Sequence, residues 1–306
     1  MSEASDEKDT VDVRAALRKA MDEGELSLKD VARAVDKSTA TIGAFLRDKY
    51  EGDNDALTEL VRGYVARLEA RAGLLPKRVK FLDTSVSRKI FNLIDLAHTE
   101  CDMAVLTGEY GMGKTVALQE YARRNPDVAL VEVDAGYSPL DVFTDICKHL
   151  DIVCAQSLGI MRQKVLEKLT NSGRLIMVDE AEHLNKRSLE MLRRLHDKAG
   201  IGLLLAGQKR LYHNLKKEQG EYGQLFSRVG MYMHIADPLT EEDCKAVVLS
   251  RIPKAKEAVK AFFQFSNGNA RKLDKLIRRA VRVAELNKQT VMDAETVESA
   301  AAVLMY

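Results

Sequence analysis

The sequence predicts an α/β fold, in which a parallel β-sheet is flanked by helices and by two all-helical segments. Short aliphatic, β-rich runs alternate with helix-like patterns from about residue 82 to 236, as in parallel sheets. Before residue 70 and after residue 239 the periodicity is helical only. A glycine-rich turn joins the first β-rich run to a helical pattern, which is typical of α/β proteins that bind phosphate groups.

Length and composition predict a soluble protein of two or three domains. The chain has 306 residues, of which 46% are hydrophobic and 30% charged. No apolar run reaches the length of a membrane span and no secretory signal is recognised, so we expect no membrane contact. The four cysteines lie far apart without CxxC spacing, which favours a reducing cytoplasm. The net charge of +1 leaves any DNA contact to local basic surfaces.

The patterns divide the chain into five segments. The polar start predicts disorder in residues 1–10, and a mixture of Gly, Pro and basic residues predicts a linker at 71–81. The other three segments are an N-terminal helix-turn-helix domain at 11–70, an α/β domain at 82–238 and a C-terminal helical domain at 239–306.

The stretch "LKDVARAVDKSTATIGAFLRDKY" predicts the helix-turn-helix. Ala32 suits the close contact between the two helices, and Asp36 tolerates the left-handed backbone that the turn requires. The predicted core is Val31, Val35, Ile42, Phe45 and Leu46, and the residues predicted to face DNA are Ser38, Thr39, Thr41, Arg47 and Lys49. These exposed side chains include few arginines and no amides, which predicts phosphate contacts and weak sequence preference. A small helical bundle for protein contacts is the alternative.

The stretch "GEYGMGKT" fits the phosphate-binding loop G-x-x-x-x-G-K-[ST]. Glycines let successive N–H groups point at phosphate oxygens, and the next helix presents its positive end. Lys114 would reach the β- and γ-phosphates of ATP, and Thr115 would place a hydroxyl on Mg²⁺. A chance glycine-rich turn is the alternative, but a buried strand before the loop and a helix after it argue against that. The predicted nucleotide-binding residues of the loop are Gly108, Glu109, Tyr110, Gly111, Met112, Gly113, Lys114, Thr115 and Val116.

Two further strands end in polar residues that could complete the site. In "RLIMVDEAEHL", a buried strand delivers Asp179, which would hold Mg²⁺ through water, and Glu180, which would polarise the attacking water. The strand "IGLLLAG" is followed by Gln208, which could meet the γ-phosphate or the water, because ligands of parallel sheets bind at the carboxyl ends of strands. An exposed acidic turn and an ordinary loop glutamine are the alternatives.

Two arginines could reach a phosphate. Arg228 lies just before the last predicted strand, and Arg271 opens a helix in the C-terminal domain. From the residues alone, ordinary surface arginines are an equal alternative.

Together, "GEYGMGKT", "LIMVDEAEHL", "GLLLAGQ", "LFSRV" and "GNARKL" resemble the ordered motifs of an AAA+ ATPase with a C-terminal helical lid. Their combination with a small N-terminal helical domain is similar to the Mu B family of phage transposition proteins, ATP-dependent selectors of target DNA. The resemblance implies ATP and Mg²⁺ as ligands, a homo-oligomer on duplex DNA, a transposase as partner, and the cytoplasm of a bacterial or phage-infected cell as the location. It also implies that Arg228 is an arginine finger acting in trans, that Arg271 is the second sensor, and that Gln208 stands at a sensor position where asparagine is commoner.

The region that lines the DNA channel in helical AAA+ assemblies corresponds to residues after the second predicted strand. By that resemblance, Lys148, Arg162 and Lys164 are expected to contact the DNA backbone, although a solvated helix face explains them nearly as well. Two other functions stay open at this stage. One is a transcription regulator with an ATP-gated helix-turn-helix, and the other is a loader for a replicative helicase.

Overall fold

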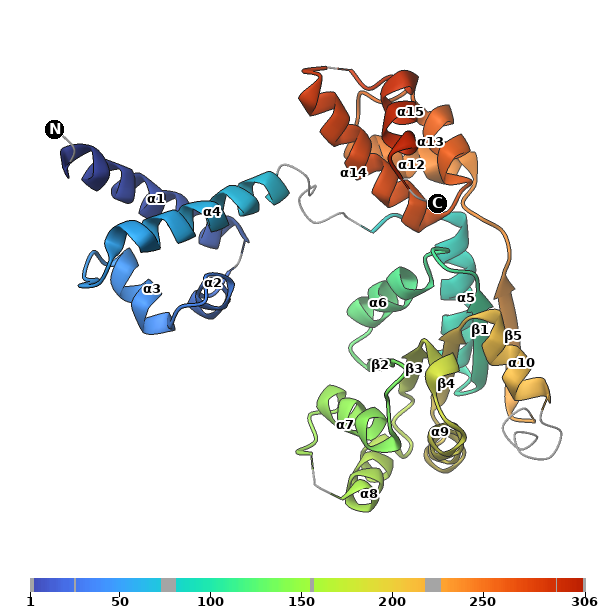
Figure 1. Cartoon of the computed structure of the whole chain (residues 1–306). Helices are drawn as coiled ribbons and strands as arrows, with labels where there is room; N and C mark the ends of the chain where they lie inside the picture. The colour runs from blue at the N-terminus through green and yellow to red at the C-terminus, as the bar shows by residue number, and fades with distance from the viewer. Residues whose placement is uncertain are drawn as a thin grey trace. The chain divides into compact units, whose positions relative to one another are not determined.

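The computed structural model describes residues 3–24, 26–72, 81–154, 157–217, 227–289 and 291–304. The chain divides into two compact units, Met1–Val79 and Lys80–Tyr306 (Figure 1). Most of the predicted linker, residues 73–80, lies outside the described residues. Among the described helices, none has the length and apolar character that crossing a membrane requires.

The first unit is all-helical. Its helices are α1 (Glu3–Gly24), α2 (Leu28–Ala34), α3 (Thr39–Leu46) and α4 (Asn54–Ala72). They share one apolar core, made by Val13, Leu17, Val31, Ala32, Val35, Ile42, Phe45, Leu57, Val61 and Val65. Helix α1 begins at Glu3, inside the segment for which composition predicts disorder, because the Glu, Ala and Lys of that segment favour helix and α1 packs against α4.

The turn between α2 and α3 has the backbone that the sequence predicts. Asp36 lies in the left-handed region with φ of 53°. Ser27 and Ser38 cap the two helices, since their hydroxyls accept hydrogen bonds from the N–H groups of Asp30 and Thr41.

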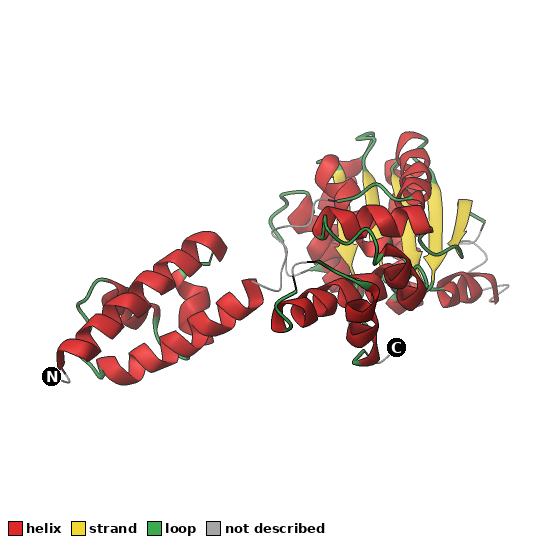
Figure 2. Ribbon diagram, turned by 90° about the horizontal axis from the view of Figure 1, so that it is seen from above, coloured by secondary structure: helices red, strands yellow, loops and turns green. Residues whose placement is uncertain are grey.

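The second unit is built on a five-stranded parallel sheet, as predicted. The strands are β1 (Met103–Gly108), β2 (Val128–Glu132), β3 (Leu175–Asp179), β4 (Gly202–Gly207) and β5 (Val229–Ile235), in the order β2-β3-β4-β1-β5. Strands β1, β3 and β4 are buried along their whole length because helices cover both faces of the sheet (Figure 2).

Each face of the sheet is covered by its own helices. Helices α5 (Ser85–Thr99) and α6 (Lys114–Arg124) pack with Ala104 and Leu106 of β1. The opposite face, with Met103 and Val105, packs against α7 (Pro139–His149), α8 (Leu158–Leu169), α9 (Lys186–Ala199) and α10 (Lys209–Lys217).

The C-terminal helices form a lid on the α5 side. They are α12 (Glu241–Arg251), α13 (Val259–Ser266), α14 (Ala270–Leu286) and α15 (Ala294–Ala302), and their core is continuous with that of α5 and α6. Asp243 links the lid to α5, because its carboxylate accepts hydrogen bonds from the N–H and hydroxyl of Ser85 at 2.9 and 2.5 Å. Burial opposes ionisation of Asp243, but these bonds and those from Thr240 hold its pKa below the ordinary value.

Candidate functional site

The glycine-rich loop after β1 has the backbone of a phosphate cradle. Gly111 and Gly113 have φ of 76° and 89°, a region that side-chain-bearing residues rarely adopt. Gly113 is the N-cap of α6 and offers no side chain to its N–H groups. A Cβ at Gly113 would meet nothing within 4 Å, so the space in front of these donors is open. The loop therefore fits an anion at the positive end of α6.

Lys114 lies folded over the loop. Its Nζ donates to the carbonyls of Gly108 at 2.6 Å and Glu109 at 3.1 Å. Burial lowers the pKa of Lys114, while the negative charge of Asp179 acts in the opposite direction. A phosphate in the loop would offer this amine stronger, charged acceptors than the two carbonyls.

Thr115 and Asp179 meet across the site. The Thr115 hydroxyl donates to Asp179 Oδ2 at 2.6 Å. Asp179 ends β3 and is only 3% exposed, and this burial raises the pKa of its carboxyl. A hydroxyl and a carboxylate side by side are oxygen ligands of the kind that Mg²⁺ takes, so these residues fit the predicted metal.

Glu180 is held in an unusual backbone conformation. Its φ is 55°, in the left-handed region, and its N–H donates to Asp179 Oδ1 at 2.9 Å. Its side chain is largely exposed, with Oε2 3.7 Å from Nε2 of His183. Such strain in a residue other than glycine is concentrated at functional sites. It is compatible with a carboxylate that faces a water-filled active site.

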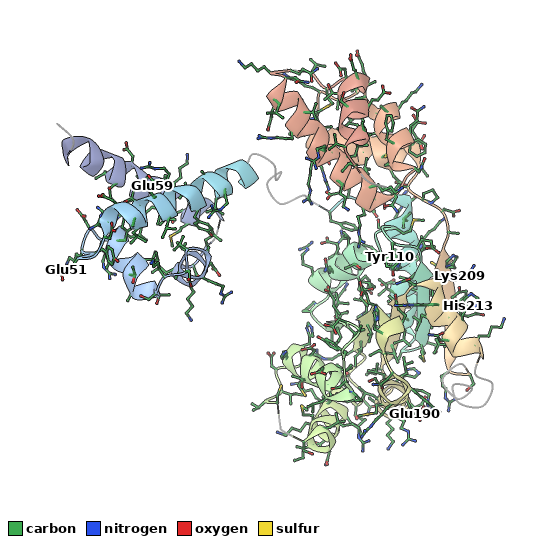
Figure 3. All side chains as sticks on the ribbon, in the orientation of Figure 1. Glu51, Glu59, Tyr110, Glu190, Lys209 and His213 are labelled. Carbon is green, nitrogen blue, oxygen red and sulfur yellow. The ribbon has the colours of Figure 1, made fainter. Side chains whose placement is uncertain are left out.

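Gln208 lies beside the phosphate loop. Its Nε2 donates to the hydroxyl of Tyr110, a loop residue labelled in Figure 3. Its backbone N–H donates to Glu182 Oε2 at 3.2 Å, and the side chain of Glu182 is 1% exposed. The roles of Glu182 and of the Tyr110 hydroxyl in placing Gln208 had no signal in the sequence.

The lid contributes two residues to the loop. The N–H of Arg271 donates to the carbonyl of Gly111 at 3.3 Å, and its positive charge contributes to the lowered pKa of Lys114. Asn269 caps α14 and also donates from Nδ2 to the carbonyl of Tyr110 at 2.8 Å. Asn269 is not among the residues predicted from the sequence, although an asparagine directly before a helix in "GNARKL" is a capping signal.

Arg228 lies at the opposite end of the strands from the phosphate loop. The strand that follows it is parallel to β1, with Val229 beside Met103, whereas the phosphate loop follows the far end of β1 at Gly108. At about 3.3 Å per residue, β1 separates the two by roughly 17 Å or more. The Arg228 side chain is 56% exposed and its Nε lies 3.3 Å from Asp197 Oδ1. The structure therefore brings every predicted nucleotide residue together except Arg228.

The predicted DNA residues of the first unit lie along α3 and its ends. Ser38, Thr39, Arg47 and Lys49 are exposed, and Thr41 is partly exposed. The Ser38 hydroxyl already accepts the N–H of Thr41 at 3.0 Å.

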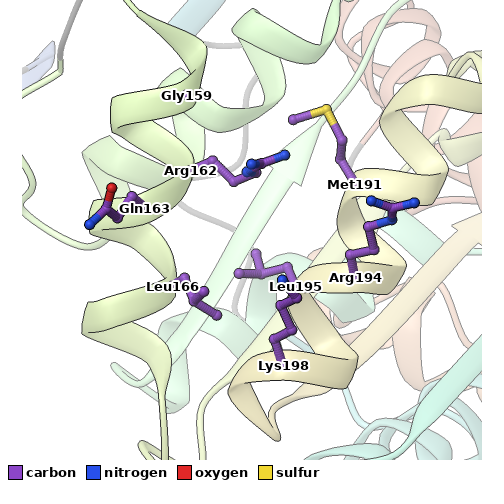
Figure 4. Close-up of a pocket in the computed structure, with 8 residues that line it drawn as sticks. All are labelled: Gly159, Arg162, Gln163, Leu166, Met191, Arg194, Leu195 and Lys198. Atoms are coloured by element: carbon purple, nitrogen blue, oxygen red, sulfur yellow. The ribbon is translucent and has the colours of Figure 1, made fainter.

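The other three predicted DNA residues lie on α7 and α8. Lys148, on α7, pairs with Asp145 at 2.7 Å. Arg162 lines a pocket of about 240 Å³ between α8 and α9, together with Arg194 and Lys198 (Figure 4). Lys164 lies on the side of α8 near Cys147, where its charge partly offsets the effect of burial, which raises the pKa of that thiol.

Comparisons with known proteins identify the domain that contains these residues. A model of the AAA domain family matches residues 97–215, which contain the phosphate loop, Asp179 and Gln208. The ADP form of the ORC2 protein of Aeropyrum pernix has the same fold, with a TM-score of 0.56 at 16% identity over 76% of this chain and 72% of that one.

Curated relatives are more informative about the family. The chain is 31% identical over 240 residues to the ATP-dependent target DNA activator B of Escherichia phage Mu, covering 77% of this chain and 76% of the relative. It is 29% identical over 218 residues to the Mu-like prophage FluMu DNA transposition protein B of Haemophilus influenzae, covering 70% of this chain and 76% of the relative. With its AAA fold and this extent of similarity, the chain belongs to the family of ATP-dependent target DNA activator B proteins.

Proposed function

We propose that this protein is an ATPase that assembles on duplex DNA when it holds ATP, selects transposition target DNA and recruits and stimulates a transposase there. The names of its relatives, an ATP-dependent target DNA activator and a DNA transposition protein, support this role. The observation that carries the mechanism is the position of Arg228, which lies at the opposite end of the parallel strands from the nucleotide residues.

The nucleotide would be bound by the loop, α6 and the lid. Lys114 would exchange the carbonyls of Gly108 and Glu109 for the β- and γ-phosphate oxygens of ATP. Thr115 and Asp179 would hold Mg²⁺, which neutralises phosphate charge as the γ-phosphate leaves. Glu180 would accept a proton from the attacking water, and Gln208 would orient that water or the γ-phosphate.

The lid would report on the nucleotide. Arg271 is already tied to the loop through its backbone, so its guanidinium has only to swing toward the phosphates. Because Asn269 and Arg271 both contact the loop, a change in the conformation of the loop would act directly on the start of α14.

Arg228 would act on the ATP of a neighbouring subunit. Because β1 separates it from the loop of its own chain, its exposed guanidinium can meet a γ-phosphate only across a subunit contact. ATP would then bridge Lys114 of one subunit and Arg228 of the next. Hydrolysis would remove the γ-phosphate, weaken this contact and release the assembly from DNA.

DNA would be contacted mainly through its phosphates. Helix α3 of the first unit and the residues at its ends present hydroxyls and two cations, Arg47 and Lys49, and no exposed amide side chain. Such a surface suits backbone contacts with little sequence preference, whose affinity falls with salt.

The test is imaging by negative-stain electron microscopy on long duplex DNA of random sequence, with ATP, with ADP and without nucleotide. Continuous filaments with ATP alone are the expected result. Particles at one fixed position in all three conditions would instead identify a sequence-specific regulator, and rings that ignore DNA would identify a helicase loader. Arg228→Ala should still bind ATP, yet form no filaments.

A further inference from the structure

Arg228 is at one end of a row of four paired side chains whose charges alternate in sign. Glu190, labelled in Figure 3, lies on α9 with Arg193 and Asp197, and Asp197 in turn faces Arg228. We propose that Asp197 is a positioning residue for Arg228, which fixes the finger so that its terminal nitrogens face the γ-phosphate of a neighbour. This inference rests on the proposed function, because it gives Arg228 a partner subunit to act on.

The three residues of this row that lie on α9 are firmly held. Arg193 has a side chain only 10% exposed and donates to both oxygens of Glu190, at 2.9 Å from Nε and 2.7 Å from Nη2. Its remaining Nη1 donates to Asp197 Oδ2. A buried guanidinium is costly unless all its sides are paired, so the pairing with Arg193 favours the orientation that Asp197 has here.

Asp197 uses its two oxygens on two different elements. Oδ2 accepts from Arg193 on its own helix, whereas Oδ1 lies 3.3 Å from Nε of Arg228, just before β5. The carboxylate thus joins the α9 side of the sheet to the segment that carries the finger. A pair between two residues of one exposed helix, such as Glu59 and Arg62 on α4, makes no such link between elements.

The geometry leaves the working end of Arg228 available. In the ion pair of Arg228, Nε lies 3.3 Å from Asp197 Oδ1, and no residue other than Asp197 is a partner of this side chain within the described part of the chain. The two terminal nitrogens can then bind two oxygens of one phosphate side by side, which is the geometry that makes arginine a strong phosphate ligand. Fixing the side chain beforehand also lowers the entropy that is lost when it docks on the neighbour.

Helix α9 separates this row of charged side chains from the pocket between α8 and α9. Arg194 and Lys198 point into the pocket between α8 and α9 (Figure 4), whereas Arg193 and Asp197 belong to the network of the finger. Glu190 Oε1 is shared, since it also accepts from Nε of Arg194 at 2.8 Å. Substitutions at Asp197 therefore test the finger without altering a residue that lines the pocket.

The first measurement compares Asp197→Ala and Asp197→Glu with the native chain in ATP affinity, thermal stability and DNA-stimulated ATP turnover. Asp197→Ala should bind ATP normally and turn it over about tenfold more slowly, because the finger loses the ion pair that orients it. Asp197→Glu keeps the charge and should recover part of the loss. Asp237→Ala, which removes a carboxylate paired with Lys89 at 2.8 Å, is the matched control and should have no effect on turnover.

Mixing subunits separates a positioning role from a merely structural one. Glu180→Gln subunits bring intact fingers but cannot activate water, whereas Asp197→Ala subunits bring intact nucleotide sites. If Asp197 acts through Arg228 in trans, an equal mixture should turn over more ATP than the sum of the two samples measured separately. A mixture that equals the sum would overturn the proposal, as would Asp197→Ala turnover at the native rate.

Arg228→Ala distinguishes this inference from the proposed function. If Arg228→Ala assembles and hydrolyses ATP like the native chain, the trans finger fails and Asp197 has nothing to position. If Arg228→Ala is impaired and is rescued by Glu180→Gln subunits while Asp197→Ala is normal, only the role of Asp197 is wrong. The double variant Asp197→Ala/Arg228→Ala should be no worse than Arg228→Ala, since both changes disable one unit.

Discussion

Asn269 of the lid and Tyr110 of the phosphate loop are joined by a hydrogen bond of 2.8 Å, from the side-chain amide of one to the carbonyl of the other. The same amide group caps α14, because its Oδ1 accepts the N–H of Lys272 at 3.1 Å. A Cβ on Gly111 would collide with this asparagine. A side chain at position 111 would therefore displace Asn269 from the loop, and the φ of 76° at Gly111 would strain it as well.

Asn269→Ala should lower both stability and nucleotide affinity. Loss of the cap costs about 1 kcal/mol of unfolding free energy, and loss of the loop contact should weaken ATP binding by about threefold to tenfold. Urea unfolding and titration with a fluorescent ATP analogue measure the two effects.

Two variants separate the cap of Asn269 from its loop contact. Asn269→Asp keeps a capping oxygen but loses the Nδ2 donor, so it should bind ATP weakly while remaining nearly as stable as the native chain. Asp293→Ala removes the cap of α15, where Asp293 accepts the N–H of Thr296 at 2.8 Å, away from the loop. It should lose stability without losing ATP affinity. Equal ATP affinity in Asn269→Asp and the native chain would contradict a role for the loop contact.

Asp179→Asn should lose activity while gaining stability without nucleotide. Burial raises the pKa of Asp179, so the ionised carboxylate is less favourable in the folded chain than in the unfolded one. An amide keeps an oxygen for Thr115 without the buried charge. Without a metal ligand, hydrolysis should fall by about 10²-fold or more.

The pH dependence of folding stability tests the prediction for Asp179→Asn. Because the folded pKa is raised, the native chain should lose stability relative to Asp179→Asn as pH rises through that pKa. Thermal unfolding across pH 4 to 8, without nucleotide or Mg²⁺, measures the difference. A variant less stable than the native chain throughout would show that the charge of Asp179 is compensated in the nucleotide-free site.

The sheet could be predicted because local pattern decides it. Runs such as "MAVLTG" and "RLIMVD" are buried on both faces, and the structure forms β1 and β3 from them. The left-handed turn at Asp36 was likewise predictable from residue type, because few residues other than glycine accept that backbone. The association of Lys114, Thr115, Asp179 and Gln208 follows from parallel topology, which gathers strand ends at one edge.

Contacts between distant elements could not be read from the sequence. The bond from Asn269 to Tyr110 depends on how the lid docks, and the pairing of Asp197 with Arg228 depends on where α9 ends beside β5. The left-handed backbone of Glu180 is imposed by its surroundings, because glutamate does not favour it. The DNA contacts of α3 and of the three residues on α7 and α8 stay predictions.

Tyr110→Phe and Gln208→Ala should have opposite effects on ATP turnover. The Gln208 amide donates a hydrogen bond to the Tyr110 hydroxyl, so it must leave that hydroxyl to reach the γ-phosphate or the water. Gln208→Ala should lower turnover by about 10²-fold, as loss of a preorganised donor does. Tyr110→Phe removes the competing acceptor, and turnover should stay the same or rise by up to about threefold.

Steady-state turnover at saturating ATP and DNA measures both variants, and ATP affinity should be close to native in each. If Tyr110→Phe were as slow as Gln208→Ala, the two residues would be acting as one unit in the active complex, with the hydroxyl orienting the amide.

Glu120 on α6 gives a prediction about acid stability. Hydrogen bonds from Arg123 and Arg124 hold the pKa of its carboxyl at about 2, below the ordinary value of 4.5. A depressed folded pKa stabilises the native chain fully above pH 4.5, and this stabilisation is lost as pH falls through about 2. The native chain should therefore be more stable than Glu120→Gln at pH 7, and the difference should shrink steadily below pH 4.5.

Urea unfolding at several pH values tests this prediction. In an Arg123→Ala background the same comparison should give a smaller difference, because Arg123 makes the larger contribution to the pKa shift. A difference between Glu120→Gln and the native chain that is constant from pH 7 to pH 3 would contradict the assignment.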